Sequence, residues 1–476
     1  MFFALVAFLL FGLLVGGIVL LIIRSQNKEL VDNSLRALAG SVYLRIFLMG
    51  LLVLLSQIPM LFVDGIIGER QISADRVARD IAQANGESQT LIGPYLVVPY
   101  EWETTRRESY EDENGDTKYR DVPAIQVIEA VFLPQRLEID GMLDPEMLER
   151  SIYRVLTYRG QVSMRGQFSQ PDFSRFARQP SRVLWDQAYT SLSLSDMRTL
   201  DSGATIKVGG MPLELNPGGK LVDNGLHGFA QLPANPTAAQ LAFEIELGFR
   251  GQGNFNVAPL AMENRLQLSS TWPSPSFTGA VRPTDTRIDE NGFTAIWSPS
   301  GLARSYPQAF EFDSSTVSAT RQFITGVSLF ERFGTYGQID RATKYSLLIV
   351  GLTFMLIFVV DQSGNRRMHG LQYLVVGGGM TLFYLLLLSI SEVLGFTPAF
   401  AIGAGALSVS IAAYIGAAIG SAKRAAVVFV TLVALYAILY SLLNLEDYAL
   451  LVGSVLLFIV LLAIMFVTRR MNVKSA

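Results

Sequence analysis

Seven long apolar runs restrict the fold of this chain more than any other feature of its sequence. They cover residues 2–23, 44–63, 343–361, 371–390, 397–419, 425–443 and 448–467. A helix needs roughly 17–25 such residues to cross the hydrocarbon core of a bilayer. Inside lipid, backbone N–H and C=O groups must be hydrogen-bonded within the protein, which favours helices. The sequence therefore predicts a multi-pass α-helical integral membrane protein.

Composition agrees with this prediction and excludes several chemistries. Only 17% of the residues are charged, against roughly 25% in soluble domains, and the mean hydropathy is +0.35. The net charge of −3 shows no basic excess, so we predict no nucleic-acid partner. Cysteine is absent, which removes disulfides, thiol nucleophiles and iron–sulfur ligands.

The first apolar run has no positive segment before it and is too long for an ordinary signal peptide. We expect residues 1–42 to form an extra N-terminal membrane helix and a cytoplasmic linker; an anchor peptide that is later removed is the alternative. Gly12 and Gly16 have the spacing that lets two membrane helices approach closely. Small residues on a lipid-facing helix would give the same pattern.

The residues between the second and third runs have ordinary polarity and a period of two. In LAFEIELGF (241–249) apolar and polar residues alternate, as in a half-buried strand. Asn114-Gly115, Pro217-Gly218-Gly219 and Asn291-Gly292 predict turns. One helix is predicted over 71–86, ending at Asn85-Gly86. This pattern predicts a large inserted β-rich α+β domain, sandwich-like, built as one sandwich or as two lobes.

The predicted domains follow from these patterns. Residues 1–42 hold the extra helix and linker, 43–67 a membrane helix that precedes the inserted domain, 68–338 the β-rich domain, and 339–476 a five-helix transmembrane block. Lys and Arg gather in the loops at 362–370 and 420–424 and in the C-terminal tail, whereas the loops around 392 and 446 are acidic. Because cytoplasmic loops hold the positive excess, we predict a periplasmic β-rich domain, a cytoplasmic C-terminus and an external N-terminus.

Several long stretches carry a family resemblance. They are TLIGPYLVVPY (90–100), TWPSPSFTG (271–279), RATKYSLLIVGLTFMLIFVVD (341–361), HGLQYLVVGGGMTLFYLLLLSISEVLGFTPAF (369–400) and a final Asn-Leu-Glu-Asp loop. From residue 43 to the C-terminus the chain resembles the CreD family, inner-membrane proteins of Gram-negative bacteria. The resemblance implies a membrane helix, a large periplasmic domain and a C-terminal helical bundle. It also implies a link to a two-component regulon, to cell-envelope integrity and to colicin and β-lactam sensitivity, without an established activity. Residues 1–42 are an addition to the family pattern.

Most groups that a catalytic site needs are missing. The chain has two histidines, His227 and His369, and no G-x-S-x-G, H-E-x-x-H or P-loop motif. The acidic stretch 108–119 lacks the glycine and distal glutamate of an EF-hand loop, so we interpret it as a solvated hairpin tip. We predict no enzyme, no cofactor and no metal site.

Positively charged residues beside the runs are predicted to anchor the chain at the membrane surface. Arg341 and Lys344 lie three residues apart on one helix side, where they reach lipid headgroups or pair with Asp340 or acidic outer loops. Ser346 is two residues from Lys344 and does not face it, which argues against a Ser–Lys catalytic pair. Two arginines in the next loop, Arg366 and Arg367, are the other candidate anchors.

The run at 371–390 carries a continuous face of small and polar residues. The face contains Tyr373, Gly377, Thr381 and Tyr384, with Gln372 beside it. Such a face packs against another membrane helix or lines a polar cavity. No charged residue lies in the middle of any run, although ion-coupled transport usually needs one or a broken helix. The triple glycine at 377–379 is a place where a helix could break.

The sequence is compatible with three functions. We favour a non-enzymatic CreD-type protein that supports envelope integrity or stress response by binding envelope proteins or glycans through the periplasmic domain. The alternative is a transporter or lipid-handling protein with a polar cavity lined by Gln372, Tyr373, Thr381 and Tyr384. An envelope hydrolase would require a clustered Ser/Lys or Asp/Glu pair in a periplasmic cleft. The lipid bilayer is a further partner, and no pattern indicates an oligomeric state.

Overall fold

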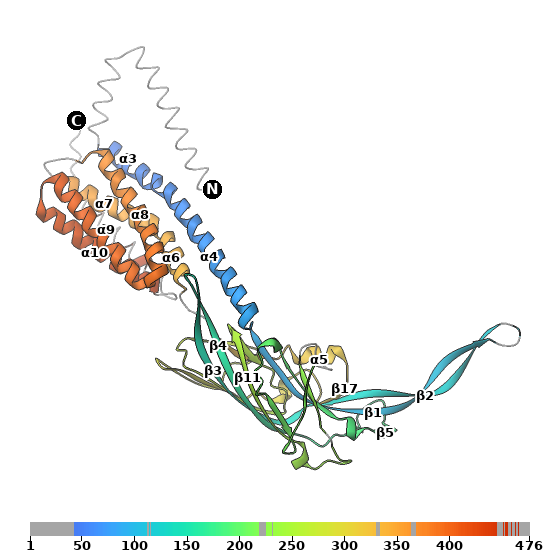
Figure 1. Cartoon of the computed structure of the whole chain (residues 1–476). Helices are drawn as coiled ribbons and strands as arrows, with labels where there is room; N and C mark the ends of the chain where they lie inside the picture. Colours follow the sequence, from blue (N-terminus) through green and yellow to red (C-terminus); the bar gives the residue numbers. More distant parts are fainter. Residues whose placement is uncertain are drawn as a thin grey trace. The chain divides into compact units, whose positions relative to one another are not determined.

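The structure, a computed structural model, describes residues 42–465 except 112–113, 115, 219–224, 231, 330–333, 363–367, 445–450, 452, 456–457, 459–461 and 463–464. The first apolar run and the predicted linker lie outside the described residues. The chain divides into two compact units (Figure 1). The helical unit contains the residues up to Ala74 and those from Phe333 onward, and the β domain is Asp75–Arg332. The sequence alone places these boundaries after residues 67 and 338.

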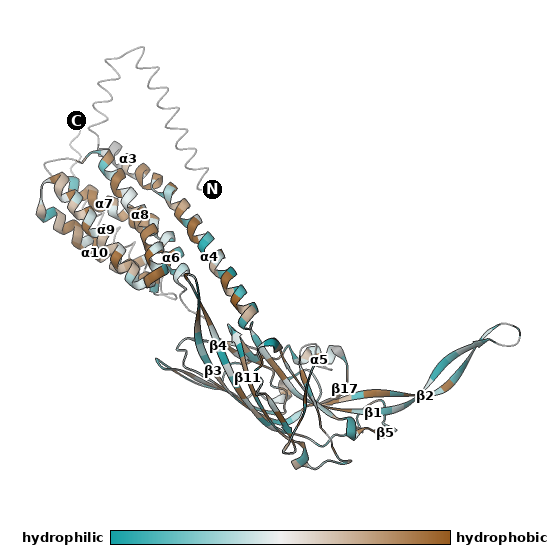
Figure 2. Cartoon of the chain, viewed as in Figure 1, coloured by the Kyte–Doolittle hydropathy of each residue, from teal (hydrophilic) through white to brown (hydrophobic). Residues whose placement is uncertain are grey.

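Mostly apolar helices make up the helical unit, as the brown colour of α8, α9 and α10 in Figure 2 shows. The helices are α3 (Val42–Leu55), α4 (Gln57–Asn85), α6 (Thr335–Lys344), α7 (Ser346–Gln362), α8 (Gly370–Leu394), α9 (Phe396–Ile419) and α10 (Ala422–Asn444). In the described part of the chain, four helical segments are long and apolar enough to cross a membrane, or five if α6 and α7, bent by 50°, form one span. Most of the run at 448–467 lies outside the described residues.

The sequence predicts that the second run and the helix over 71–86 are separate helices, but the structure joins the last part of the run to that helix. The break falls at Ser56, and α4 then continues without interruption to Asn85. Pro59 lies in the first turn of α4, where its missing N–H is tolerated but its ring prevents the preceding helix from continuing. No proline follows before residue 85, and Gly65 and Gly68 do not stop the helix. The predicted separate helix is therefore the end of a 29-residue one.

The β domain consists of two mixed sheets. The ten-stranded sheet contains β1 (Gln89–Glu111), β2 (Thr117–Phe132), β5 (Arg182–Val183), β6 (Tyr189–Leu194), β9 (Leu215–Pro217), β10 (Leu226–Phe229), β12 (Asn254–Val257), β14 (Pro275–Gly279), β17 (Ala309–Glu311) and β18 (Thr325–Leu329). The eight-stranded sheet contains β3 (Pro134–Arg150), β4 (Tyr153–Phe168), β7 (Thr205–Val208), β8 (Met211–Pro212), β11 (Ala242–Gln252), β13 (Glu263–Ser270), β15 (Asp285–Asp289) and β16 (Gly292–Trp297). One short helix, α5 (Ser314–Thr320), accompanies them.

The β domain forms one compact unit and not two lobes. A large apolar core joins the two sheets, and a second, smaller apolar cluster that includes Tyr95 and Phe310 lies in the same domain. The large core contains Leu96 and Val98 from β1 together with Ile139 from β3, Val162 from β4 and Trp297 from β16, all at most 3% exposed. The order in the second sheet is β15-β16-β13-β3-β4-β11-β7-β8. Among the described strands, only the pairs β1/β12 and β3/β13 are parallel. Strand alternation puts one set of side chains into this core and the other set on the outside.

One hairpin extends beyond the rest of the domain (Figure 1). β1 and β2 remain paired from Leu96/Phe132 to Glu111/Thr117, as the predicted turn at 114–115 requires. β5 adds to β1 only at Tyr100 and Glu101, and β17 adds to β2 only at 130–132. Residues 102–111 and 117–127 therefore form a two-stranded ribbon, which we call the arm.

A candidate binding cleft on the eight-stranded sheet

The polar face predicted on the 371–390 run is largely a packing face of α8. Tyr373 and Tyr384 are 7% and 1% exposed, and their rings lie edge-on against Phe354 and Phe383. The Tyr373 hydroxyl donates to Asp361 Oδ2 over 3.4 Å. Asp361, at the end of α7, also accepts from a backbone N–H over 2.7 Å, so this buried carboxylate is held by hydrogen bonds.

The other members of that face also have local roles. Gln372 completes a capping box, because its Oε1 accepts from the backbone N–H of His369 over 2.8 Å. The Thr381 hydroxyl donates to the Gly377 carbonyl one turn earlier. α8 runs through the triple glycine without a break. A Cβ on Gly377 would come within 3.1 Å of the Phe354 ring, so this glycine permits close helix contact.

Two of the candidate anchors, Arg341 and Lys344, lie in the last turn of α6. Lys344 Nζ is 2.6 Å from Asp340 Oδ2, an i, i+4 pair on exposed helix surface. Arg341 donates to the Gly337 carbonyl over 3.4 Å. Arg366 and Arg367 lie outside the described residues. His227 is on β10, where its ring contacts Tyr189 and Phe229 edge-on. These contacts give the ring a packing role.

A cleft of about 500 Å³ lies on the outer face of the eight-stranded sheet. Its floor is built from the four central strands β13, β3, β4 and β11, in that order. Strand register aligns their outward side chains in two rows: Gln267, Asp140, Ser163 and Glu246 in the first, and Ser269, Met142, Gln161 and Gly248 in the second. The floor is thus polar except for one thioether, that of Met142, which is 51% exposed.

The same strands keep the floor in place through their inward side chains. Ile139, Val162 and Leu247 alternate with the floor residues and are 2–4% exposed in the domain core. A one-residue slip of any strand would exchange the two sets. The burial of the apolar set therefore fixes which polar side chains reach the cleft.

The loop at 196–204 forms a wall of the cleft, with Asp201 and Gly203 in the lining. The Asp201 backbone N–H donates to the Gly248 carbonyl over 2.7 Å. A Cβ on Gly248 would lie 2.5 Å from Asp201 Oδ2, so the carboxyl group rests directly on this glycine. The absence of a side chain at 248 is what lets the wall approach the floor.

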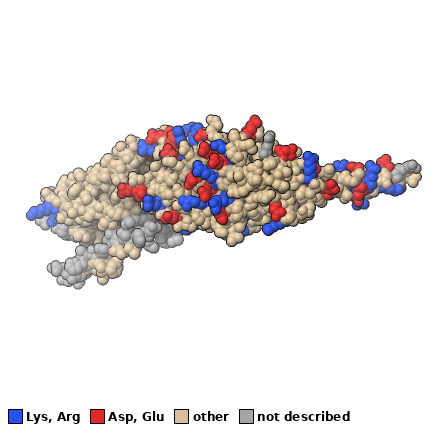
Figure 3. All heavy atoms as spheres, turned by 90° about the horizontal axis from the view of Figure 1, so that it is seen from below, with Lys and Arg blue, Asp and Glu red and all other residues tan. Residues whose placement is uncertain are grey.

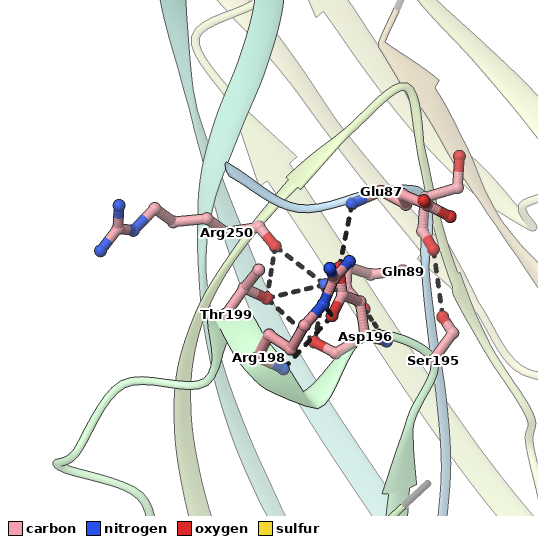
Figure 4. Close-up of polar contacts among 8 residues, drawn as sticks. Glu87, Gln89, Ser195, Asp196, Arg198, Thr199 and Arg250 are labelled. Carbon is pink, nitrogen blue, oxygen red and sulfur yellow. Dashed lines mark hydrogen bonds and ion pairs between the residues drawn. The ribbon is translucent and has the colours of Figure 1, made fainter. Parts of the chain in front are cut away.

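A buried polar joint holds the base of this wall (Figure 4). Gln89, at the start of β1, is 0% exposed. Its Oε1 accepts from the Asp196 N–H over 3.0 Å, and its Nε2 lies 2.9 Å from the Arg250 carbonyl and from Thr199 Oγ1. The Thr199 hydroxyl lies 2.9–3.0 Å from the carbonyls of Asp196 and Arg250. The joint connects the wall to β11, which carries the cleft floor, and to the segment that follows α4.

An ion pair closes the outer side of the joint. Asp196 is held by Arg198, whose Nε and Nη2 donate over 2.8 Å each, and its Oδ2 also accepts from the Glu87 N–H. Hydrogen bonding to Arg198 lowers the pKa of the Asp196 carboxyl below its usual 3.8. Gly86, just before Glu87, has φ +120° and lies against the Arg250 carbonyl. A residue with a side chain would be strained there.

The cleft is acidic and its carboxylates are free to bind. Asp140, Asp201 and Glu246 are exposed, and no ion pair or hydrogen bond engages their carboxylates within the described chain. No Lys, Arg or His lines the cleft. Among the described residues no group of three or more metal-ligating side chains is placed to hold a metal. The cleft thus offers hydrogen-bond acceptors, two amides and two hydroxyls to a ligand.

Sequence reasoning missed the cleft and the joint. Alternation placed Glu244 and Glu246 opposite an apolar face, but nothing local indicated that four separated strands would align their polar faces. Gln89 and Asp196 are 107 residues apart and carry no motif. The only available sign was the turn after Asn85, which marks the chain segment that the joint holds.

Fold and site together define a class: a membrane protein with apolar helices that carries a large β domain with an outward-facing polar cleft. Residues 41–474 match the family model described as inner membrane protein CreD. The chain therefore belongs to the CreD family, as its motifs suggested. It is 29% identical over 422 residues to inner membrane protein CreD of Escherichia coli (strain K12), covering 88% of this chain and 91% of that protein. The family is named for its location and not for a reaction.

Proposed function

We propose that this CreD-family protein is a multi-pass inner-membrane protein whose periplasmic β domain binds a hydroxyl- or amine-bearing envelope component in the cleft of the eight-stranded sheet. Binding there would support envelope integrity or the response to envelope stress. The observation that carries the proposal is the cleft: 500 Å³ is within the roughly 300–1,000 Å³ typical of ligand sites. Its lining carries three carboxylates, two amides and two hydroxyls, and none of the lining residues is positively charged.

The lining chemistry selects the ligand class. Carboxylate, amide and hydroxyl groups accept hydrogen bonds from sugar hydroxyls and amines, and Met142 offers an adaptable apolar contact. Three carboxylates without a cation repel phosphate and anionic lipid headgroups. An amino-sugar glycan therefore fits better than a phospholipid. Asp140, Asp201 and Glu246 are all exposed, whereas a general acid for glycoside hydrolysis needs a desolvated carboxyl group, which favours binding over hydrolysis.

Charge at the helix ends supports the proposed orientation. Lys423 and Arg424 lie at the connection of α9 to α10, and Glu392 lies near the opposite end of α9. Because positive residues mark cytoplasmic connections, the end near Glu392 and the β domain are assigned to the periplasm. Since the chain has no cysteine, single-cysteine variants test this cleanly. A cysteine at Leu302 should react with a membrane-impermeant maleimide in intact spheroplasts, and one at Lys423 only after lysis. The reverse pattern would overturn the orientation.

Calorimetry tests the binding proposal itself. The full chain in nanodiscs is titrated with chitooligosaccharides, as soluble amino-sugar probes, and with inorganic phosphate as an anionic control. We expect saturable binding of the oligosaccharide only, weakened at least about tenfold by the double variant Asp140→Asn/Glu246→Gln, because each good charged hydrogen bond contributes about 1.5–3 kcal/mol. The matched variant Glu138→Gln/Glu244→Gln, on the same sheet face outside the cleft, should bind normally. No binding, or equal binding by both double variants, would refute the proposal.

A groove in the helical unit supports lipid handling as a second candidate function. About 330 Å³ of space lies between α9 and α10, lined mainly by small and aromatic residues. The Ser408 and Tyr436 hydroxyls in this lining are buried and have no hydrogen-bond partner among the described residues. None of the five residues predicted on the α8 face lines it. Lipid that stays bound to the purified protein after delipidation, and that is absent from the Gly405→Leu variant, would favour this candidate.

A further inference from the structure

The arm is exposed on both faces and both edges. Ile125, Val127 and Tyr119 are 66%, 55% and 60% exposed on one face, and Tyr110 is 44% exposed on the other. Paired positions share a face, which puts Ile125 opposite Glu103 and Tyr110 opposite Lys118. No third strand among those described pairs with residues 102–111 or 117–127. A two-stranded ribbon is marginally stable alone, so its length and exposed apolar side chains need an explanation outside the domain core.

The three arginines of the arm all contact other side chains of the arm. Arg107 lies over the Tyr119 ring at 4.8 Å and Arg120 over the Tyr110 ring at 5.8 Å. Arg106 and Arg120 also pair with Glu108 at 3.2 and 3.8 Å. These cross-strand contacts stiffen the ribbon. They leave no free arginine on the arm.

Acidic residues are in excess and are less engaged. Residues 101–127 contain eight acidic and four basic residues: Glu101, Glu103, Glu108, Glu111, Asp112, Glu113, Asp116 and Asp121 against Arg106, Arg107, Lys118 and Arg120. Glu103, Glu111 and Asp121 are exposed and form no ion pair within the described chain. Figure 3 shows the charges along the arm. Such a surface repels anionic lipid and favours a partner with Lys or Arg.

The size of the arm decides how a partner would hold it. At about 3.3 Å per residue, eleven residues extend about 36 Å, and a two-stranded face about 10 Å wide offers roughly 350 Å². A specific interface buries about 800 Å² per partner. One face alone is too small, whereas contact with both faces and the edges reaches that area.

The edges themselves disfavour extension of the sheet by another strand. Pro123 is in the free edge of β2 and cannot donate a backbone hydrogen bond. The free edge of β1 carries charged residues at Glu103, Arg107 and Glu111, which discourage edge pairing. Side-chain contacts are therefore the expected mode of binding.

From these observations we infer that the arm inserts into a cleft of a partner protein whose walls carry Lys or Arg and whose floor is apolar. The arm is a second surface, and this inference is independent of the proposed glycan cleft. The arm recognises a protein through Ile125, Val127 and Tyr119 on one face and Tyr110 on the other. Glu103 and Asp121 supply complementary charge.

Site-specific photo-crosslinking in cells that produce the full chain tests the inference. A photoreactive phenylalanine analogue replaces Ile125 or Tyr110, one on each face, and Leu302, which is 82% exposed elsewhere on the domain, as control. The same protein should attach at both arm positions and not at Leu302, and its attached peptide should contain Lys or Arg beside apolar residues. Glu103→Lys/Asp121→Lys should lower the yield at least about tenfold, whereas the exposed control Glu138→Lys/Glu244→Lys should not.

Other outcomes would overturn the inference. These are adducts from one face only, adducts with a second copy, lipid or glycan, no adduct, or a yield that the charge reversal does not change. All variants are first checked for wild-type thermal unfolding. Because Asp140→Asn/Glu246→Gln should leave the arm adducts unchanged, a failure here is distinguishable from a failure of the cleft proposal.

Discussion

Replacing Gln89 by leucine should loosen the cleft wall and destabilise the β domain. The change keeps approximate volume but removes the carbonyl that accepts from the Asp196 N–H and the amide that reaches the Arg250 carbonyl and Thr199 Oγ1. The side chain is 0% exposed, so water does not replace these partners. A buried donor left without a partner costs about 1–3 kcal/mol, and each further lost hydrogen bond about 1 kcal/mol. We expect the free energy of unfolding to fall by about 3 kcal/mol.

Tryptophan fluorescence measures this effect in the full chain. All four tryptophans, Trp102, Trp185, Trp272 and Trp297, lie in the β domain, so their emission reports this domain even when the helices stay folded in detergent. For a domain of this size 1 kcal/mol shifts the midpoint of thermal unfolding by about 2–4 °C, which gives a decrease of roughly 6–12 °C. The control Gln126→Leu, on the exposed arm, should shift it by less than about 2 °C. A Gln89→Leu midpoint equal to that control would refute the structural role assigned to the joint.

Three further outcomes are expected. Gly248→Ala should push the wall from the floor, lowering the unfolding midpoint and weakening oligosaccharide binding, because overpacking costs about 1–3 kcal/mol. Gly203→Ala, with open space around its added methyl, should not change the unfolding midpoint beyond a small backbone effect. Asp196→Asn should destabilise the domain at pH 7, since a carboxyl with a lowered pKa in the folded state contributes stability above its unfolded pKa and loses it as the pH falls through the folded value. The stability difference from wild type should therefore shrink below about pH 4, as unfolding curves at several pH values would show. In α8, Gly377→Leu should lower the melting temperature of the helical unit in detergent. Gly378→Leu should not, because an added Cβ at Gly378 meets nothing within 4 Å. Equal effects would contradict the packing role.

The sequence predicted the features that depend on local pattern. Apolar runs of sufficient length located α7 to α10, and alternation located β11 through Phe243, Ile245 and Leu247. Asn85-Gly86 correctly ended a helix. The continuity of α4 through 64–70 was not predicted, because residues there are neither apolar enough for a span nor strong helix breakers. Gly65 and Gly68 lie in that segment, and the helix continues through both.

Features that depend on strand order were beyond sequence reasoning. The cleft requires β13, β3, β4 and β11 to be neighbours. β3 and β4 are consecutive in the chain, but β11 and β13 join them from a later part of the sequence. The arm was predicted as a hairpin tip, but its length was not, because strands that bury neither face show no apolar period. Spacing alone predicted a small and polar face on α8, but the contact between Gly377 and the Phe354 ring depends on helix packing that spacing does not specify.

Crosslinking from the floor of the cleft in living cells tests the central claim most directly. A photoreactive side chain at Met142, which is 51% exposed within the cleft, should attach to an envelope component that carries sugar hydroxyls or amines. The yield should fall strongly in Asp140→Asn/Glu246→Gln and stay unchanged in Glu138→Gln/Glu244→Gln. Attachment only to lipid, or no attachment from this position, would contradict the claim that the cleft is the binding site.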